Sequence, residues 1–196
     1  MIVLQPVKRT DSLLLKYMAV HYSAPKGFVG RNICYAITYA GKNYGYIVGG
    51  SATLHLIGRD KLLNGIPLNN IVNNIFYHAV PIDKKYPLRN FTTKVLALWR
   101  EQIRKDWQNK YGDEVKGFET LVELPRTGEC YRRDGWINVG QTKGYTCKRV
   151  AGKGTDSWTG KRIWDTKNLR PKHVFIFPLR KELSYAETTV DEETGC

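Results

Sequence analysis

The feature that most constrains the fold of this 196-residue chain is a long helical pattern between two strand-like segments. In residues 88–112, LRNFTTKVLALWREQIRKDWQNKYG, large apolar side chains recur at steps of three and four residues, as they do on the buried face of a helix. These side chains are Phe91, Val95, Leu98, Trp99, Ile103 and Trp107. Tyr111-Gly112 is a typical helix end, because glycine readily adopts the left-handed conformation that closes a helix. The segments NIFYHAVPI before the helix and GFETLVEL after it both predict strands.

The N-terminal part of the chain predicts a strand, a helix and a hairpin. MIVLQPV is expected to be a strand, and DSLLLKYMAVHYS begins with an Asp/Ser cap and continues with apolar residues at helical spacing. NICYAITYA and NYGYIVGGSATLH are separated by Gly41-Lys42-Asn43, which is typical of a hairpin. Gly49-Gly50 inside the second of these strands predicts a bulge, or a backbone that another element approaches closely.

The C-terminal part completes one domain. Residues 128–144, GECYRRDGWINVGQTKG, predict a short helix leading into a strand, and HVFIFPL predicts a final strand. The expected order is therefore β-α-β-β-β-α-β-α-β-β. We expect a single α/β (α+β) domain over residues 1–181, with a central twisted mixed sheet flanked by helices. Residues 182–196 are acidic and are expected to form a disordered tail.

Charge is the strongest global signal. The chain carries a formal net charge of +13, and its 31 Lys and Arg residues all fall within residues 1–181. Only 13 of the 18 Asp and Glu residues lie there, so this part carries a formal charge of +18. A body this basic favours polyanionic partners, above all nucleic acid, over the alternative of a merely solvated basic surface.

The sequence favours a cytoplasmic protein without a membrane partner. The N-terminus turns polar after a strand-length apolar run, so it does not resemble a secretory signal. No stretch approaches the ~18 consecutive apolar residues of a membrane span. The four cysteines, Cys34, Cys130, Cys147 and Cys196, are widely spread and show neither zinc spacing nor a disulfide framework. They are interpreted as reduced thiols.

The segment 143–173, inserted before the last strand, is too long and too polar for a simple connector and is expected to be either functional or disordered. Its basic residues interleave with aromatic ones, a combination that suits phosphate neutralisation and base stacking. The candidate DNA-binding residues are Lys143, Tyr145, Lys148, Arg149, Lys153, Trp158, Lys161, Arg162, Trp164, Lys167 and Arg170. The alternative is a solvated, mobile loop, for which two exposed tryptophans are a poor choice.

The order of elements is similar to that of the GNAT acyltransferase superfamily, and Tyr131-Arg132-Arg133-Asp134-Gly135-Trp136 resembles its Tyr-x-x-x-Gly-Phe-like turn. VHYS at 20–23 and TGECYRRDGWINVGQTKG further resemble a narrower group, the Mom DNA-modification proteins of phages and the related DruA family of an anti-phage system. Further similarity lies in RD at 59–60, NNIFYHAVP, DWQNKYG, FETLVEL and VFIFPLRK. The resemblance covers roughly residues 11–181 in order.

The sequence departs from these families at two places. Many relatives carry an arginine where this chain has Phe76, and the glycine-bearing turn that enters the long helix in GNAT proteins is replaced by residues 89–94, RNFTTK. A helix start still offers free N–H groups to an anion. The candidate donor-binding residues are Arg89, Asn90, Thr92, Thr93 and Lys94. Ordinary capping with a basic surface is the alternative, and the departure implies a donor bound atypically or a donor other than acyl-CoA.

The resemblance implies catalytic roles for His21, Tyr22, Ser23, Glu123 and Tyr131. In GNAT proteins the tyrosine that matches Tyr131 often donates a proton to the departing thiolate, and a phenol with a pKa near ~10 stays protonated at pH 7. The histidine suits a general base or a metal ligand, or it satisfies carbonyl groups at the helix end. Glu123 is expected to face Tyr131 and His21, and Glu119 is the alternative residue for this role.

Three neighbouring groups receive simpler interpretations. Arg132 and Arg133 are expected to stabilise negative charge or to meet a DNA phosphate. Trp136 is expected to pack the helix against the sheet, and Asp60 to cap a short helix over KLLNG.

Three functions follow from the resemblance. A Mom-like protein would install a carbamoylmethyl-type group on the exocyclic amine of adenine in DNA, using acetyl-CoA or a related donor, and would protect phage DNA from restriction. It would be encoded by a phage or prophage and act in the bacterial cytoplasm. Iron would be a further cofactor, but no ligand motif for it is present. The alternatives are a non-catalytic DruA-like DNA-binding protein and, more weakly, an N-acyltransferase for a small molecule or a protein. The oligomeric state stays open, with a homodimer as one alternative.

Overall fold

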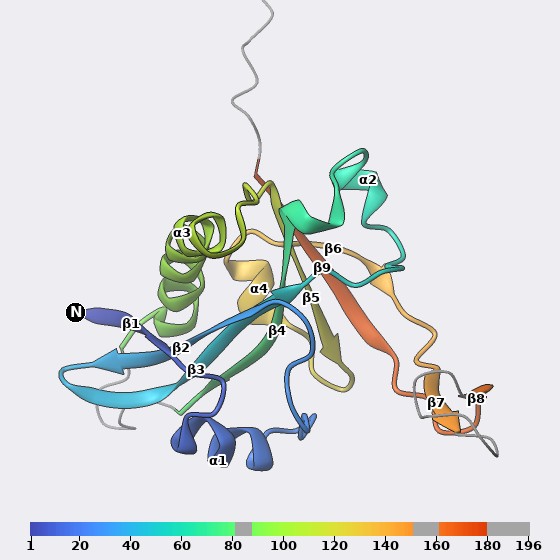
Figure 1. The fold of residues 1–196 in the computed structure, drawn as a ribbon, viewed down its shortest axis with the longest axis horizontal. Coiled ribbons are helices and arrows are strands. Elements are labelled where there is room, and N and C mark those ends of the chain that lie inside the picture. The colour runs from blue at the N-terminus through green and yellow to red at the C-terminus, as the bar shows by residue number, and fades with distance from the viewer. Residues whose placement is uncertain (81–87, 151–160, 180–196) are drawn as a thin grey trace, which may run out of the picture.

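A seven-stranded sheet organises the chain in the computed structural model, which describes residues 1–80, 88–150 and 161–179 (Figure 1). The strand order is β1-β2-β3-β4-β5-β9-β6, and β4 with β5 is the parallel pair while the other neighbours are antiparallel. The strands are β1 (Ile2–Val7), β2 (Asn32–Tyr39), β3 (Lys42–Ser51), β4 (Ile71–Ala79), β5 (Gly117–Glu123), β6 (Ile137–Gln141) and β9 (Lys172–Pro178). The predicted α/β fold with a central mixed sheet is confirmed.

Helices cover both faces of the sheet (Figure 1). The long helix α3 (Phe91–Tyr111) and the short α4 (Glu129–Arg133) pack on one face, and α1 (Ser12–Val20) and α2 (Asp60–Leu63) pack on the other. A 3-10 turn, η1 (Leu68–Asn70), leads into β4. The alternation along β9 shows the two faces, because Phe175 belongs to the core under α3 while Val174 and Ile176 belong to the core under α2.

The predicted long helix is confirmed, and its packing explains the glycine pair in β3. Trp99 and Ile103 are fully buried, whereas Leu98, which the spacing placed on the same stripe, is 38% exposed. A Cβ atom on Gly49 would lie 2.1 Å from Cδ1 of Ile103, so the close approach predicted there is required by α3. Gly112 ends the helix with φ +77°.

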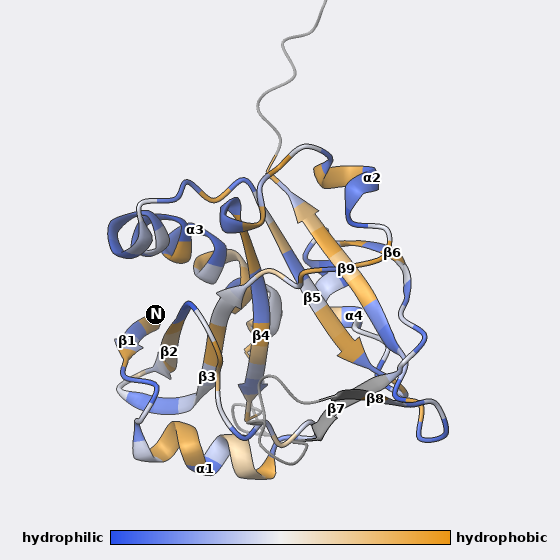
Figure 2. Cartoon of the chain, turned by 45° about the vertical axis from the view of Figure 1, so that its right-hand side comes forward, coloured by the Kyte–Doolittle hydropathy of each residue, from blue (hydrophilic) through white to orange (hydrophobic). Residues whose placement is uncertain are grey.

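The first helix is also capped as its sequence predicts. The Asp11 carboxylate accepts hydrogen bonds from the backbone N–H groups of Leu13 and Leu14 at 3.1 and 2.8 Å, which lowers its pKa. Leu14 and Met18 are buried under α1. Figure 2 shows the hydrophobic residues of α1 interspersed with polar ones along the helix.

β4 and β5 pair only at their first residues and then separate (Figure 1). Ile71, Val72 and Asn73 of β4 face the first three residues of β5. Beyond them, β4 carries one residue more than its partner strand β3, because Val48 faces Phe76 while Gly49 faces Asn74. Such a bulge bends a strand and changes which face its side chains point to. The result is a fork between the two parallel strands, open toward their C-terminal ends.

The segment 143–173 is partly a second sheet, which corrects the prediction of a long loop. β7 (Thr146–Val150) and β8 (Lys161–Asp165) form an antiparallel pair. The sequence concealed these strands because both are basic and carry little apolar alternation. Residues 151–160, between β7 and β8, lie outside the described residues, and so does the predicted tail 182–196. Within the described part of the chain, no helix is long and apolar enough to cross a membrane.

Candidate functional site

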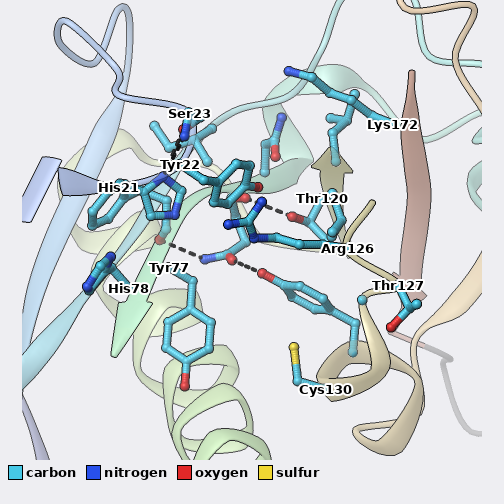
Figure 3. A pocket seen from close by; sticks show the side chains of 18 of the residues that line it. His21, Tyr22, Ser23, Tyr77, His78, Thr120, Arg126, Thr127, Cys130 and Lys172 are labelled. Atoms are coloured by element: carbon cyan, nitrogen blue, oxygen red, sulfur yellow. Dashed lines mark hydrogen bonds between the residues drawn. The ribbon is translucent and has the colours of Figure 1, made fainter. Parts of the chain in front are cut away.

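A cavity of about 980 Å³ occupies the fork between β4 and β5 (Figure 3). The end of α1, at residues 21–23, lines one side of it, and the turn and helix at residues 125–131 line the other. Side chains of β4 and β5 form its floor. The fork therefore brings together two segments that are about a hundred residues apart in the chain.

Tyr131 lies on the α4 side and is oriented by Asn74. Its hydroxyl donates a hydrogen bond of 2.6 Å to Oδ1 of Asn74. The amide nitrogen of Asn74 points to the carbonyl oxygens of Val48 and Phe76, at 3.3 and 3.5 Å, so its oxygen must face the phenol. The Thr120 hydroxyl donates a hydrogen bond to the backbone carbonyl oxygen of Asn74 at 2.9 Å. The sequence analysis missed Asn74, and the signal that could have found it is an asparagine pair inside an otherwise apolar strand.

Burial keeps the Tyr131 proton in place. The side chain is 6% exposed, and desolvation raises the pKa of the phenol well above its usual value. Cys130 lines the same cavity, and burial also raises the pKa of its thiol. The phenol is therefore fully protonated at neutral pH, which is the state a general acid needs.

The helix that carries Tyr131 is anchored to α3 and to the sheet. The Asp134 carboxylate accepts from the Arg100 guanidinium of α3 and from the indole nitrogen of Trp136, the latter at 2.9 Å. Trp136 is 3% exposed and its ring centroid lies 5.2 Å from that of Tyr131. The packing role predicted for Trp136 agrees with this burial.

His21, Tyr22 and Ser23 form the opposite side of the cavity. The His21 ring is 8% exposed and lies 4.6 Å from the ring of Phe76, centroid to centroid. Its Nδ1 is 2.8 Å from the Ser23 hydroxyl and accepts from the Ser23 N–H at 3.3 Å. Burial, followed by the neighbouring His78, lowers the pKa of His21 to about 4. The imidazole is therefore neutral at pH 7.

Arg126 is a cavity residue that the sequence analysis did not identify. Its guanidinium carbon lies 3.7 Å from the centroid of the Tyr22 ring, which places a cation over an aromatic face (Figure 3). Burial raises the pKa of the Tyr22 phenol. The signal for Arg126 was its place two residues after the predicted strand GFETLVEL, at the edge of the sheet where site residues gather.

Glu123 does not face Tyr131, which corrects the expected arrangement. Its carboxylate lies 3.8 Å from the Arg170 guanidinium and 3.8 Å from the Lys172 ammonium group. The antiparallel register of β5 with β9 places Lys172 directly opposite Glu123. The carboxylate lines an adjoining hollow of about 430 Å³ instead of the main cavity.

Glu119, the competitor, is fully buried in a structural network. One of its oxygens lies 3.2 Å from the Arg59 guanidinium, and the other accepts from the Thr53 N–H at 2.5 Å. Asn73 donates to the Thr53 hydroxyl at 3.1 Å and also lines the cavity. Asp60 is the first residue of α2 and its side chain does not cap that helix, so the capping interpretation was wrong. Arg59 occupies the N-cap position of α2, and its guanidinium pairs with the buried Glu119 carboxylate.

The start of α3 holds the candidate donor-binding residues. Asn90 precedes the helix with φ +59°, and its side chain makes no capping hydrogen bond. The Thr93 hydroxyl donates back to the Asn90 carbonyl at 2.9 Å. Arg89 and Lys94 are exposed, and Thr92 lies in the first turn, whose N–H groups lack acceptors within a helix. This end of α3 can accept an anion, and the left-handed residue there is an asparagine instead of a glycine.

The adjoining hollow connects the cavity to the β7–β8 hairpin. Ser23, Leu121 and Lys172 line both spaces, and the hollow continues to Lys143 and Tyr145 at the base of the hairpin. Tyr145 is 47% and Trp164 57% exposed. Three of its lining residues are cationic and one is anionic, so the hollow is basic.

The other candidate DNA-binding residues have different settings. Arg132 and Arg133 are exposed on α4 and pair with Glu129 at 3.7 and 3.1 Å. Lys167 is exposed beyond β8. The backbone alone is described for Lys148, Arg149, Lys161 and Arg162. Lys153 and Trp158 lie outside the described residues. Within the described ranges, no group of three or more His, Cys, Asp or Glu residues is placed to hold a metal ion.

The fold is that of the GNAT acetyltransferases. A GNAT family acetyltransferase from Elizabethkingia anophelis with acetyl-CoA bound is similar at a TM-score of 0.54 and 10% identity, over 91% of this chain and 98% of that one. A Bacillus subtilis acetyltransferase in complex with CoA is similar at 0.55 and 10%, over 92% and 100%. An aminoglycoside acetyltransferase in complex with coenzyme A and kanamycin is similar at 0.52 and 12%, over 91% and 95%. No described protein family and no curated protein matches the chain by sequence. The GNAT-like fold that the sequence predicts is confirmed.

Proposed function

We propose that this protein is a transferase that moves a small group from acetyl-CoA or a related donor to the exocyclic amine of adenine in DNA, the group that Mom-like proteins modify. With a thioester donor the amine nitrogen would bond to the carbonyl carbon, the carbon–sulfur bond would break, and coenzyme A would leave as the thiolate. The observation that carries the proposal is the cavity in the β4–β5 fork, which is lined by residues that follow α1, on one face of the sheet, and by α4, on the other face. A protonated phenol lies on one side of it, and an aromatic, basic wall lies on the other. Donor and acceptor can thus meet from opposite sides of a single sheet.

The residues present fit a thioester donor. The cavity of about 980 Å³ is in the size range of small-molecule sites. The start of α3 has no side-chain cap and carries two exposed cations, Arg89 and Lys94. The solved structures named above that share this fold hold acetyl-CoA or CoA. Such a donor would supply an electrophilic carbonyl and a thiolate leaving group. Arg89, Thr92 and Lys94 would bind its phosphates.

Tyr131 would act as the general acid. Its hydroxyl keeps its proton at neutral pH, and Asn74 holds the phenol in one orientation inside the cavity. A phenol that still carries its proton at neutral pH can donate it to a leaving thiolate. Removing the hydroxyl should therefore affect turnover more than donor binding.

His21 and Ser23 would handle the proton that the amine loses. The imidazole is neutral at pH 7, and it is hydrogen-bonded to the Ser23 hydroxyl at 2.8 Å. Because the pKa of His21 is about 4, an imidazolium formed there gives up its proton to water readily, and His21 returns to its neutral form after each turnover.

DNA is the acceptor best suited to the charge and to the aromatic wall. The chain has a formal net charge of +13, and the hollow that leads from the cavity to the hairpin is basic. The rings of His21, Tyr22 and Phe76 offer flat faces of the kind that hold a base taken out of the stack. A basic track for phosphates, a pocket with flat rings and a donor site together favour a nucleobase over a small polar amine as the acceptor.

The proposal is tested by nucleoside mass spectrometry. The purified protein is incubated with acetyl-CoA and a single-stranded oligonucleotide with one adenine, and the DNA is digested to nucleosides. A modified deoxyadenosine that is absent with Tyr131→Phe is the expected result, and its added mass identifies the transferred group. DNA extracted from cells that express the chain, digested in the same way, covers donors other than acetyl-CoA.

Other outcomes favour the alternatives. Unmodified adenine in both samples, together with salt-sensitive DNA binding, would indicate a DruA-like binding protein. Coenzyme A binding without DNA affinity would indicate an N-acyltransferase for a small molecule or a protein.

A further inference from the structure

Arg126 is distinguished among the charged residues that line the cavity. The cavity is lined by two residues with full positive charge, Arg126 and Lys172. Lys172 is paired with the Glu123 carboxylate at 3.8 Å. Within the described part of the chain, Arg126 has no carboxylate partner, and its guanidinium contacts the Tyr22 ring. A guanidinium held at a cavity without a counter-charge is a ready site for an anion.

The other arginines near the site are already committed. Arg59 is buried against Glu119, Arg100 against Asp134, and Arg132 lies near Glu129. Arg126 is exposed, and its backbone is fixed by a hydrogen bond from its N–H to the Glu123 carbonyl at 3.2 Å. The chain thus holds the position of Arg126 while leaving its charge available.

The chemistry of the guanidinium identifies the class of ligand. Its planar fork matches the oxygens of a phosphate, and it can keep one face on an aromatic ring while its edge donates hydrogen bonds. Two phosphates are candidates, one in the DNA backbone and one in the donor. Arg126 belongs to the turn before α4 and its guanidinium lies over the Tyr22 ring, whereas the candidate donor-binding residues lie at the start of α3.

We propose that Arg126 is a positioning residue that binds a backbone phosphate next to the target nucleotide, while Tyr22 keeps the guanidinium flat at the cavity. This inference rests on the proposed function, because it takes DNA as the acceptor substrate. The contact fixes the register of the strand, so that the nucleotide beside the bound phosphate is the one whose base reaches the cavity. Base identity is left to the groups inside it.

The experiment replaces single phosphates by neutral methylphosphonates in an oligonucleotide with one adenine. Binding to the full-length protein is measured by fluorescence anisotropy for each linkage around that adenine. For the wild-type protein we expect one flanking linkage to cost about tenfold in affinity, and distant linkages to cost far less. With Arg126→Met the same replacement should cost nothing further, and the salt dependence of binding should weaken by about one phosphate contact.

Two further variants complete the design. Arg126→Lys retains the charge but loses the planar fork, so it should recover only part of the affinity. Arg104→Met removes an exposed arginine of α3 that does not line the cavity, and it should leave the methylphosphonate effect unchanged. Arg126 is exposed, and equal Tm values for all variants show that each protein is folded.

Several results would overturn the inference. The first is that the wild-type protein does not bind the oligonucleotide. The second is that no flanking methylphosphonate lowers its affinity. The third is that a methylphosphonate lowers the affinity of Arg126→Met as much as that of the wild type. Loss of coenzyme A affinity in Arg126→Met, with DNA binding intact, would assign the phosphate to the donor instead. The adduct assay separates this inference from the proposed function. Adducts with no Arg126 effect would refute the inference alone, and an Arg126 effect without adducts would refute the transferase alone.

Discussion

The two sides of the cavity differ in how firmly their polar groups are held. On the α4 side, Tyr131 and Asn74 satisfy each other, and Asp134 ties the helix to Arg100 and Trp136. Each of these groups is buried or nearly so. The α4 side is therefore organised before any ligand arrives, which is the condition for efficient general acid catalysis.

The α1 side is more open. Tyr22 is 38% exposed, and the Arg126 guanidinium that lies over it is also exposed, although His21 is buried. Apart from the hydrogen bonds between His21 and Ser23, the contacts here are ring faces and one guanidinium, which can adapt to a flat ligand. Under the proposed function, the α4 side would protonate the leaving group, and the α1 side would receive the acceptor base and the proton that its amine loses.

The largest expected effect is that of Tyr131→Phe on turnover. Loss of the phenol proton should reduce the rate about 10²- to 10⁴-fold while leaving donor affinity within a factor of a few. Because burial raises the pKa of this phenol, its deprotonation should not reduce the wild-type rate anywhere in the neutral range. Steady-state kinetics on the oligonucleotide measure both quantities.

The matched control is Tyr35→Phe. Tyr35 is fully buried and donates to the Asp106 carboxylate at 2.7 Å, away from the cavity. The Tyr35→Phe variant should be less stable but should keep the wild-type turnover rate. Equal losses of rate in Tyr35→Phe and Tyr131→Phe would contradict the role of Tyr131.

A smaller effect is expected from Asp134→Ala on stability. The change leaves the Arg100 guanidinium and the Trp136 indole without their acceptor, and it should lower the free energy of unfolding by about 3 kcal/mol. Urea unfolding measures it. Glu129→Ala on the same helix removes only exposed pairs and should cost less than about 1 kcal/mol. Similar losses in both would mean that α4 is not anchored through Asp134.

His21 should make stability depend on pH. Its pKa is about 4 in the folded protein, against ~6.5 in an unfolded chain, so the unfolded state binds a proton first as the pH falls. The stabilisation is complete above about pH 6.5 and is lost progressively toward pH 4. Between these limits the wild type should lose roughly 2 kcal/mol more than His21→Gln, measured by chemical unfolding at each pH.

The neighbouring histidine complicates this measurement and also controls it. His78 faces His21, and burial lowers its pKa too, but it is present in both proteins and cancels in their difference. His55→Gln, at an exposed position outside the cavity, should behave as the wild type does. A wild-type profile parallel to that of His21→Gln would show that His21 is not held neutral by the fold.

The smallest expected effect concerns the hairpin that extends the open side. Trp164 is 57% exposed on β8, so Trp164→Ala should weaken binding of single-stranded DNA about tenfold, the value typical of one stacked base, with an unchanged Tm. Ile163→Ala, at the adjacent residue, which is 50% exposed, is the control and should bind nearly as the wild type does. A fall in Tm for Trp164→Ala would show that the residue holds the hairpin together instead.

Elements with a strong local pattern could be predicted from the sequence. The helix ending at Gly112 and the cap at Asp11 depend on residues close together in the chain, and both occur where their patterns indicated. The weaker patterns failed for local reasons too. The basic strands β7 and β8 lack apolar alternation, so no strand was indicated there.

The sequence by itself determined the order of the elements, the apolar faces that form the core, and the tyrosine-bearing helix before β6, because these depend on the spacing of neighbouring residues. Tertiary structure alone decided which polar groups meet. The register of β5 with β9 assigned Glu123 to Lys172. The bulge in β4 placed Phe76 on the α1 face beside His21, while Asn74 stayed on the face of Val72 and met Tyr131. The fork placed Arg126 over Tyr22. Contacts between strands and turns far apart in the chain are set by packing and register, and neither leaves a periodic trace in the sequence.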